Sequence, residues 1–401
     1  MATLELVCVA LGLLIVVLAL GWEAQGLSSQ RDKVPLRIAV TGSRGKSTLV
    51  RLVVAALRTA NVQVVAKTTG SAPRLHHVDG QEESIRRRGT PSLLEIKQAL
   101  RLAGKEQAEV LVVELMSLQP ENLFAESVRL LQPQFLLLTN VREDHLEQMG
   151  ETRFQIAEAL AAAIPLGSKV LLPEEEYYPV FKEVAQARQA EVIQVDQTWL
   201  EHFPQRELAA LPSGVFFSQL RLLACLWKQL GLAEKMGLNF LRSYHADPGA
   251  PRLFQFKYGP SRTKWVAFNA FAANDPLSTR ELMDQFKKQL PSEPEPWIGL
   301  LNLRADRGDR TWQWIKALQQ NLFPEFERFY VLGRTAPAFC RHCRGAPGVS
   351  AIPLSLKKPP LVMNRLARDY PLGGQLIGVG NIGGLGKELL AFWSELNHHN
   401  S

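Results

Sequence analysis

The chain has 401 residues, more than one ordinary hydrophobic core holds, so we expect two or three domains. Its composition, 46% apolar and 21% charged, excludes a chain that is disordered throughout. The net charge of +7 is mild and suits an anionic substrate or lipid surface; because no basic stripe is interleaved with aromatic residues, we expect no nucleic-acid partner. Four cysteines are too few for a disulfide framework and favour a reducing compartment.

The chain begins with an apolar segment, residues 4–22, in which Glu5 is the only charged residue. A helix of about 18 to 20 such residues can span a bilayer. A cleaved signal peptide would need a basic start and a small-residue cleavage site, neither of which is convincing, and a buried core helix is a third interpretation. Arg31, Lys33 and Arg37 follow the segment and nothing basic precedes it. The positive-inside rule therefore predicts a single-pass cell-membrane protein with its body in the cytoplasm.

A glycine-rich loop follows the first expected strand, Leu36–Val40, and precedes an expected helix at residues 49–57. Strand, loop and helix in this order are typical of a phosphate-binding site, where backbone N–H groups and the helix N-terminus face the phosphates. Lys46 can reach the terminal phosphates and the Ser47 hydroxyl can ligate Mg²⁺. A plain glycine-rich turn with a surface lysine is the alternative, and the flanking elements argue against it. The residues assigned to ATP here are Thr41, Gly42, Ser43, Arg44, Gly45, Lys46, Ser47 and Thr48.

Two later strands also end in polar residues. The apolar run 108–113 leads into Glu114, and the run 133–138 leads into a segment that contains Asn140 and His145. A carboxylate at a strand end beside a phosphate loop is well placed for Mg²⁺. Each residue alone fits a plain strand-end glutamate or a structural histidine, but their order along the chain favours a joint site. A small polar loop, residues 67–74, follows another strand, at the edge where α/β sheets bind ligands.

A Pro/Gly/Asp-rich segment near residues 246–252 indicates a linker, and a second α/β alternation follows it. We therefore expect an α/β protein with an N-terminal transmembrane anchor (1–25), a P-loop-type central domain with a mostly parallel sheet (26–245) and a smaller, Rossmann-like C-terminal domain (246–401). The G-x-G-x-x-G spacing at residues 378–383 is a weak signal, since no acidic residue follows about 20 positions on, so we expect no dinucleotide site. Cys340 and Cys343 have a metal-ligand spacing but lack a second pair, which favours a plain loop.

Taken together, these blocks resemble the Mur ligase superfamily, and within it the ligase subunit of capsule-type poly-γ-glutamate synthases. The resemblance covers nearly the whole chain, including the apolar start. Residues 271–275 and 304–307 distinguish this type from peptidoglycan ligases and folylpolyglutamate synthases. The matching blocks are Thr41–Thr48, Lys67–Arg74, Thr139–Gly150, Asp247–Arg252, Phe268–Thr279, Asn302–Arg310 and Gly378–Gly384.

The resemblance implies an ATP- and Mg²⁺-dependent ligase that polymerises glutamate through γ-carboxyl linkages. ATP would convert a carboxylate to an acyl phosphate, which the incoming amine attacks. The implied partners are the growing poly-γ-glutamate chain, the membrane and further synthase subunits, and a homo-oligomer stays open. The implied catalytic residues are Lys46, Glu114, His145 and Arg252; the implied metal ligands are Ser47, Glu114 and His145. Further ATP contacts would be Asn140, Gln219, Arg252 and Asn274, and the substrate would meet Thr69, Arg74, Asp275, Arg304, Asp306 and Arg307.

The sequence departs from the superfamily pattern in two places. Many Mur ligases carry a carbamoylated lysine shortly after the histidine, whereas residues 151–164 contain no lysine. Gln219 stands where relatives place an asparagine that contacts adenine. Two alternatives stay open: the same chemistry with another amino acid, and a membrane-tethered P-loop NTPase that drives transport or regulation. The stereochemistry of the glutamate and the length of the polymer do not follow from the sequence.

Overall fold

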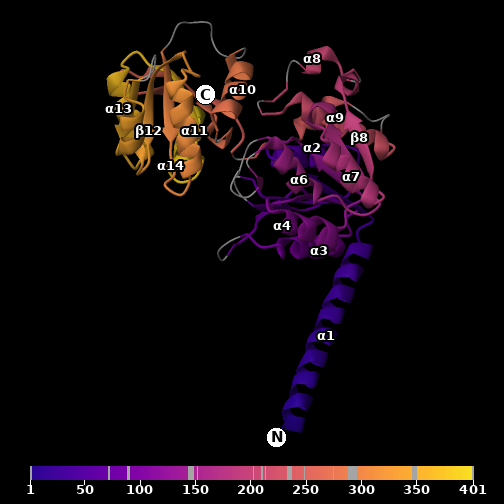
Figure 1. The fold of residues 1–401 in the computed structure, drawn as a ribbon. Helices are drawn as coiled ribbons and strands as arrows, with labels where there is room; N and C mark the ends of the chain where they lie inside the picture. The colour runs from indigo at the N-terminus through magenta and orange to yellow at the C-terminus, as the bar shows by residue number, and fades with distance from the viewer. Residues whose placement is uncertain are drawn as a thin grey trace. The chain divides into compact units, whose positions relative to one another are not determined.

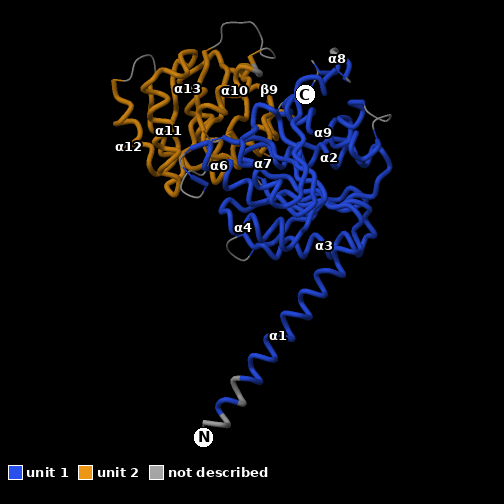
Figure 2. The backbone as a smooth tube through the Cα atoms, turned by 45° about the vertical axis from the view of Figure 1, so that its right-hand side comes forward, with its two compact units in different colours: residues 1–247 blue, residues 248–401 orange. Residues whose placement is uncertain are grey.

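The computed structural model describes residues 2–70, 73–87, 91–142, 149–150, 152–201, 203–208, 211–212, 214–232, 237–247, 249–273, 275–287, 296–345 and 350–399. The chain divides into two compact units, Met1–Asp247 (unit 1) and Pro248–Ser401 (unit 2), coloured blue and orange in Figure 2. The division falls inside the Pro/Gly-rich segment around residues 246–252. Both units have the expected α/β architecture with mostly parallel sheets.

Unit 1 begins with a long helix, α1 (Ala2–Asp32), which continues well past the apolar segment seen in the sequence. In the described part of the chain, one helical stretch, Ala10–Asp32, is long and apolar enough to cross a membrane, and none of its apolar window is buried. Figure 1 shows α1 projecting from the rest of unit 1 beside α3. Its last turns do contact the unit, because Leu27 packs on the core and the Arg31 guanidinium donates to the Arg129 carbonyl at 3.0 Å.

The unit 1 sheet has eight strands in the order β4-β3-β2-β5-β1-β6-β7-β8. β1 is central and pairs in parallel with β5 and β6, whereas β3 and β4 add an antiparallel edge. The carboxyl ends of β1, β5 and β6 therefore meet at one edge of the sheet. The strands are β1 (Leu36–Thr41), β2 (Val64–Thr68), β3 (Arg74–His76), β4 (Glu82–Ser84), β5 (Val110–Glu114), β6 (Phe135–Leu138), β7 (Lys169–Pro173) and β8 (Glu191–Val195).

Helices cover both faces of this sheet. Ile38 and Val40 of β1 pack in the cluster that contains α2 and α9, whereas Ala39 packs in the cluster that contains α3 and α6. This alternation is the expected period of a strand buried on both faces. The helical elements are α2 (Lys46–Thr59), α3 (Glu95–Lys105), α4 (Pro120–Phe124), η1 (Ala125–Leu131), α6 (Arg153–Ala161), η2 (Glu174–Glu176), α7 (Pro179–Ala187), η3 (Gln197–Leu200), α8 (Gln205–Leu208), α9 (Phe217–Gln229) and η5 (Leu238–Arg242).

Unit 2 is built on a six-stranded sheet in the order β13-β12-β11-β14-β10-β9, in which only β9 is antiparallel to its neighbour. Its core is rich in aromatic residues: Trp314 stacks on Phe323 and Trp393 on Phe271. The elements are β9 (Arg252–Tyr258), β10 (Thr263–Asn269), η6 (Phe271–Ala273), α10 (Pro276–Phe286), β11 (Trp297–Asn302), α11 (Gly308–Gln319), β12 (Phe326–Leu332), α12 (Ala336–His342), β13 (Ser350–Leu354), α13 (Pro359–Asp369), β14 (Gly374–Gly380) and α14 (Leu385–His399).

The first two glycines of the G-x-G-x-x-G pattern lie within a strand, because β14 continues through Gly378 to Gly380. An ideal Cβ at Gly378 would lie 2.4 Å from the Phe271 ring, so this glycine makes room for a core aromatic. The pattern therefore reflects the packing of a central strand at that position.

Candidate functional site

The loop between β1 and α2 depends on two glycines. Gly42 has φ 121° and Gly45 has φ 74°, both in the left-handed region that side chains other than glycine rarely adopt. A Cβ at Gly42 would lie 2.2 Å from Thr139 Oγ1, and one at Gly45 would lie 2.7 Å from Gln219 Nε2. The backbone can therefore take this conformation, and approach its neighbours this closely, only with glycine at both positions.

The segment after β6 holds this loop in place. The Asn140 side chain accepts from the Arg44 N–H at 3.1 Å and donates to the Arg44 carbonyl at 3.2 Å, while the Asn140 carbonyl accepts from the Ser43 N–H. The Ser43 hydroxyl adds a pair of 2.9 Å hydrogen bonds with the Arg142 backbone. The loop is thus fixed by contacts with the neighbouring strand end rather than by its own sequence alone.

Lys46 begins α2 and lies across the same loop. Its ammonium donates to the carbonyls of Gly42 at 2.6 Å and Ser43 at 3.3 Å. The positive charge is therefore held where the N-terminus of α2 also presents backbone N–H groups. This arrangement suits a phosphate group.

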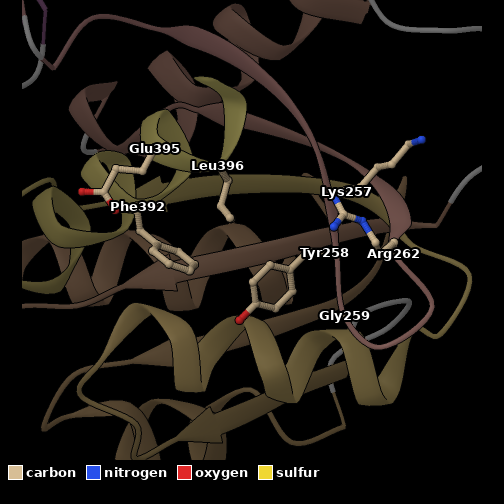
Figure 3. Close-up of a pocket in the computed structure, with 7 residues that line it drawn as sticks. All are labelled: Lys257, Tyr258, Gly259, Arg262, Phe392, Glu395 and Leu396. Atoms are coloured by element: carbon tan, nitrogen blue, oxygen red, sulfur yellow. The ribbon is translucent and has the colours of Figure 1, made fainter. Parts of the chain in front are cut away.

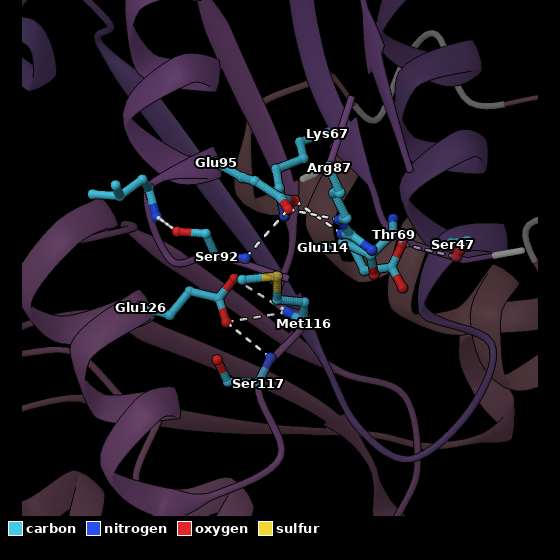
Figure 4. A network of polar contacts seen from close by, with 11 residues as sticks. Ser47, Lys67, Thr69, Arg87, Ser92, Glu95, Glu114, Met116, Ser117 and Glu126 are labelled. Atoms are coloured by element: carbon cyan, nitrogen blue, oxygen red, sulfur yellow. Dashed lines mark hydrogen bonds and ion pairs between the residues drawn. The ribbon is translucent and has the colours of Figure 1, made fainter. Parts of the chain in front are cut away.

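Ser47, Glu114 and Thr69 meet at the carboxyl ends of the strands (Figure 4). The Ser47 hydroxyl donates to Glu114 Oε2 at 2.7 Å, and the Thr69 N–H donates to the same oxygen at 2.6 Å. The Glu114 side chain is buried at the end of β5. A hydroxyl and a carboxylate are hard oxygen ligands, so these residues fit a divalent cation such as Mg²⁺.

A second carboxylate, Glu126, supports the backbone that follows β5 (Figure 4). It is fully buried and accepts hydrogen bonds from the N–H groups of Met116 and Ser117 at 3.0 to 3.1 Å. Our sequence analysis missed it, because it lies on a π-helical turn, η1, that we did not predict. Glu121, Ser127 and Arg129 lie in the same stretch, so nothing in the sequence sets Glu126 apart.

Lys67 lies on the α3 side of the sheet, one residue before Thr68. It is fully buried, and its ammonium lies 3.5 Å from Glu95, which also receives two hydrogen bonds from the Arg87 guanidinium (Figure 4). These charges hold the start of α3 against β2. Burial alone would raise the pKa of Glu95, but the hydrogen bonds from Arg87 and the charge of Lys67 outweigh it, and the pKa is lowered.

Arg74 sits in a charged cluster on the other side of the sheet. Glu82 receives two hydrogen bonds from the buried Arg51 guanidinium and lies 3.4 Å from both Arg74 and His76. Burial and the surrounding arginines lower the pKa of His76 to about 4, so the ring is neutral at neutral pH. Its Nε2 forms a 3.0 Å hydrogen bond with the Thr68 hydroxyl. The structure therefore gives Arg74 a partner in Glu82 within the β3–β4 edge.

Gln219 connects α9 to the β1–α2 loop. Its Oε1 accepts from the Phe216 N–H at 3.0 Å and its Nε2 donates to the Gly45 carbonyl at 3.1 Å. The side chain is 3% exposed. Gln219 therefore helps to hold the β1–α2 loop in position. Its contact with adenine stays a prediction.

In unit 2, polar side chains connect the ends of β11 and β14. The Asn302 amide donates to the carbonyls of Asn381 and Gly383, and the buried Arg310 donates to Asn381 Oδ1 at 3.2 Å. Arg304 and Asp306, both exposed, form a two-pronged ion pair at 2.6 and 3.0 Å. The hydrogen bond from Arg304 lowers the pKa of Asp306. Arg304, Asp306 and Arg307 thus share one loop at the carboxyl end of the sheet, as the sequence predicts.

The remaining predicted residues that the structure describes in unit 2 are Arg252, at the start of β9, and Asp275, at the start of α10; Asn269, which is not among our predicted site residues, lies between them. Asn269 ends β10, and its amide donates to the carbonyls of Gly249 and Ala250. Asp275 caps α10 by accepting from the Ser278 N–H. Arg252 is exposed at the start of β9, with its guanidinium 5.3 Å from the centre of the Phe254 ring. Two predicted residues, His145 and Asn274, lie outside the described residues.

Two hollows lie away from these strand ends. One, of about 460 Å³, lies between the β9–β10 turn and α14 and is lined by Tyr258, Arg262 and Phe392 (Figure 3). The other, of about 450 Å³, lies between β4 and α3. Burial raises the pKa of Cys340 and Cys343 to about 11, and the described residues contain no group of three or more His, Cys, Asp or Glu side chains that could hold a metal ion. These features give no support to a zinc site.

Two family models match the chain in succession. The Mur ligase middle domain matches residues 40–212, and the poly-γ-glutamate synthase CapB C-terminal domain matches residues 255–396. The first match contains the β1–α2 loop, Glu114 and Asn140, and the second contains most of unit 2. The class of protein is therefore a Mur-type ligase, an enzyme that forms amide bonds with ATP.

Curated relatives narrow the class. The chain is 30% identical over 375 residues to the capsule biosynthesis protein CapB of Bacillus anthracis, covering 92% of this chain and 78% of that protein. It is 31% identical over 363 residues to the PGA synthase CapB of Bacillus subtilis, covering 90% of each. The chain belongs to the poly-γ-glutamate synthase CapB family.

Solved structures share the fold at low sequence identity. Escherichia coli FolC in complex with ADP matches with a TM-score of 0.62 and 16% identity, over 94% of this chain and 92% of that one. The folylpolyglutamate synthase/dihydrofolate synthase of Yersinia pestis complexed with AMPPNP and Mn ion matches with a TM-score of 0.63 and 15% identity, over 93% and 92%. At these identities the likeness establishes the Mur ligase-like α/β fold alone.

Proposed function

We propose that this protein is the ATP-dependent ligase of a poly-γ-glutamate synthase, which joins glutamate residues through their γ-carboxyl groups. The observation that carries the proposal is the succession of two matches on one chain, with a Mur ligase middle domain followed by a CapB C-terminal domain. An NTPase that only hydrolyses ATP has no need of the second unit. The single-chain match to CapB proteins over nine-tenths of the sequence also supports this assignment.

The reaction begins with ATP on the β1–α2 loop. The N–H groups at the start of α2 and the Lys46 ammonium, which also donates to the Gly42 carbonyl, bind the β- and γ-phosphates. Ser47 and Glu114 would hold a divalent cation, which we take to be Mg²⁺, and that ion would neutralise charge on the transferring phosphoryl group. Thr69 fixes the Glu114 carboxylate through its N–H. His145 is the further ligand that the resemblance implies.

The γ-carboxylate of the acceptor glutamate attacks the γ-phosphorus, which releases ADP and leaves an acyl phosphate. The amine of the next glutamate then attacks the acyl carbon; the new C–N bond forms, the C–O bond to phosphate breaks, and the amine loses a proton. We place the carboxylates of the substrate at Arg304 and Arg307, since a guanidinium binds a carboxylate through two parallel hydrogen bonds. Thr69, Arg74 and Asp275 are further proposed substrate contacts, and Arg252, Asn274 and Gln219 are proposed nucleotide contacts.

We place the enzyme at the cytoplasmic face of the cell membrane, anchored by α1 and working with further synthase subunits. The exposed apolar surface of α1 supports the anchor, since side chains such as Leu14 and Trp22 are 53% and 82% exposed. ATP supply favours the cytoplasmic side. The basic residues that follow the apolar segment agree with that orientation.

The test is nucleotide turnover against a panel of amino acids, with the full chain in membranes that contain its partner subunits. We expect ADP and phosphate with glutamate, and a background rate with other amino acids and with Lys46→Ala. ADP formed with a different amino acid would keep the chemistry and change the substrate. ADP formed at the same rate without any amino acid would favour the transport or regulatory NTPase.

A further inference from the structure

Another carboxylate, that of Asp247, lies near the Ser47–Glu114 pair. A Cβ built on Gly70 would lie 2.5 Å from Ser47 Oγ and 2.7 Å from Asp247 Oδ2. The hydroxyl and the Asp247 carboxylate oxygen therefore both border the space that a side chain at Gly70 would fill. Ser47 donates its hydrogen bond to Glu114, so its hydroxyl lies near a second carboxylate, that of Asp247.

Asp247 is held there by the packing of its own segment on α2. The Arg51 guanidinium, one turn after Ser47, donates to the His245 carbonyl at 3.2 Å. Arg51 is 4% exposed and is itself fixed by Glu82. Tyr244 packs on the same core cluster, and burial raises its pKa to about 12 although it shares a hydrogen bond with Thr48. The segment 244–247 thus follows the first turns of α2.

The chemistry of this convergence points to a cation. Two carboxylates brought close together repel each other, and a divalent ion between them removes the repulsion. Mg²⁺ prefers oxygen ligands, and a hydroxyl with carboxylates is a ligand set that it accepts. The Ser47 hydroxyl, Glu114 and Asp247 supply such a set from α2, β5 and the end of unit 1.

We propose that Asp247 is a further ligand of the divalent cation at the nucleotide site. This proposal rests on the proposed function in one respect, since it assumes that the cation binds together with ATP. Asp247 is the last residue of unit 1, where the chain passes to unit 2. Binding of the metal–nucleotide complex therefore fixes the interunit segment, which couples occupancy of the site to the connection between the two units.

The test compares Asp247→Asn with wild type and with Glu183→Gln, an exposed carboxylate-to-amide change on α7. Mn²⁺ binding to the full chain is measured by electron paramagnetic resonance with a non-hydrolysable ATP analogue, and nucleotide binding is measured without metal. We expect about tenfold weaker Mn²⁺ binding in Asp247→Asn alone. We also expect no loss of metal-free nucleotide affinity, since the variant removes a negative charge from the phosphate site.

A structural role of Asp247 would lower both affinities together, and that result, or an unchanged Mn²⁺ affinity, would overturn the proposal. Gly70→Ala is the second variant: it keeps Asp247 but places a methyl group between it and Ser47, so Mn²⁺ binding should weaken in the same way. Thermal unfolding of both variants shows that they are folded. If Asp247 proves to be a ligand in an enzyme that forms no ADP with glutamate, the inference stands and the proposed function fails.

A second readout is tryptic cleavage at Arg242 and Arg252, which are exposed on either side of the segment. Mn²⁺ with the nucleotide analogue should slow cleavage severalfold in wild type and in Glu183→Gln. It should leave the cleavage of Asp247→Asn unchanged. Equal protection of Asp247→Asn would contradict the coupling.

Discussion

Asn140 forms hydrogen bonds with both backbone groups of Arg44, accepting from its N–H at 3.1 Å and donating to its carbonyl at 3.2 Å. One side chain after β6 thereby fixes the loop after β1. This relation explains why an asparagine suits that strand end, since its short amide side chain can donate and accept in one plane. The loop geometry is therefore a property of two adjacent strands.

We predict that Asn140→Ala weakens nucleotide binding about tenfold, because the loop loses two hydrogen bonds of roughly 0.5 to 1.5 kcal/mol each. Calorimetric titration with ATP measures this change. Asn122→Ala is the matched control, since the Asn122 amide forms a hydrogen bond only with Gln119 on an exposed surface. Equal affinities of Asn140→Ala and wild type would mean that the loop is rigid without Asn140.

Glu114→Gln should lower turnover about 100-fold, because the amide keeps the shape of the side chain but loses the charge that binds the cation. Binding of nucleotide in the absence of metal should persist. Steady-state ADP formation across a Mg²⁺ titration measures the effect, with Glu183→Gln as control. A variant with wild-type turnover at low Mg²⁺ would remove Glu114 from the metal site.

The lowered pKa of His76 predicts that the free energy of unfolding depends on pH in the acid range. Its pKa is lowered to about 4 in the fold, whereas the unfolded value is about 6.5, so the unfolded chain binds an additional proton between these values. The free energy of unfolding should therefore fall as the pH falls from about 6.5 to 4, by about 2 to 3 kcal/mol from this group. Well above pH 6.5 the ring is neutral in both states and contributes no pH dependence.

His76→Gln tests this prediction, since its amide can still pair with Thr68. Denaturant unfolding at several pH values between 4 and 8 should give a flatter profile for the variant than for wild type. His77→Gln is the control on the same strand edge, where Glu106 raises the pKa instead. Parallel profiles of wild type and His76→Gln would show that His76 does not carry the acid sensitivity.

A chain that starts at Glu23 should leave the membrane and keep its nucleotide site. We choose this start because Glu23 forms an ion pair with Lys97 and Leu27 packs on the unit 1 core, whereas the preceding turns are exposed. Fractionation after a carbonate wash, followed by nucleotide titration, measures both properties. A truncated chain that stays in washed membranes would contradict a single anchor in α1.

The sequence was sufficient for the parts of this structure that depend on local pattern. The strand–glycine loop–helix order predicted β1 and α2, and the runs 108–113 and 133–138 predicted β5 and β6 because buried parallel strands are largely apolar. Glu114 could be recognised since it directly follows such a run. The domain boundaries and the role of each site residue stay predictions.

What the sequence could not supply depends on contacts between distant segments. Nothing near Asp247 shows that Gly70 and Ser47, far away in the chain, bring its carboxylate to the site. Glu126 was missed because a π-helical turn has no clear sequence signature, and the glycine pattern does not show that Gly378 makes room for the Phe271 ring. These outcomes are set by tertiary packing, which periodicity does not encode.

The most direct test of the central claim is the number of ADP molecules formed per amide bond, measured with the full chain, its partner subunits, ATP and glutamate. ADP is counted by chromatography, and γ-amide bonds by nuclear magnetic resonance of the isolated product. Our account predicts one ADP for each γ-linked bond. ADP that accumulates without new amide bonds, or bonds that form through the α-carboxylate, would contradict it.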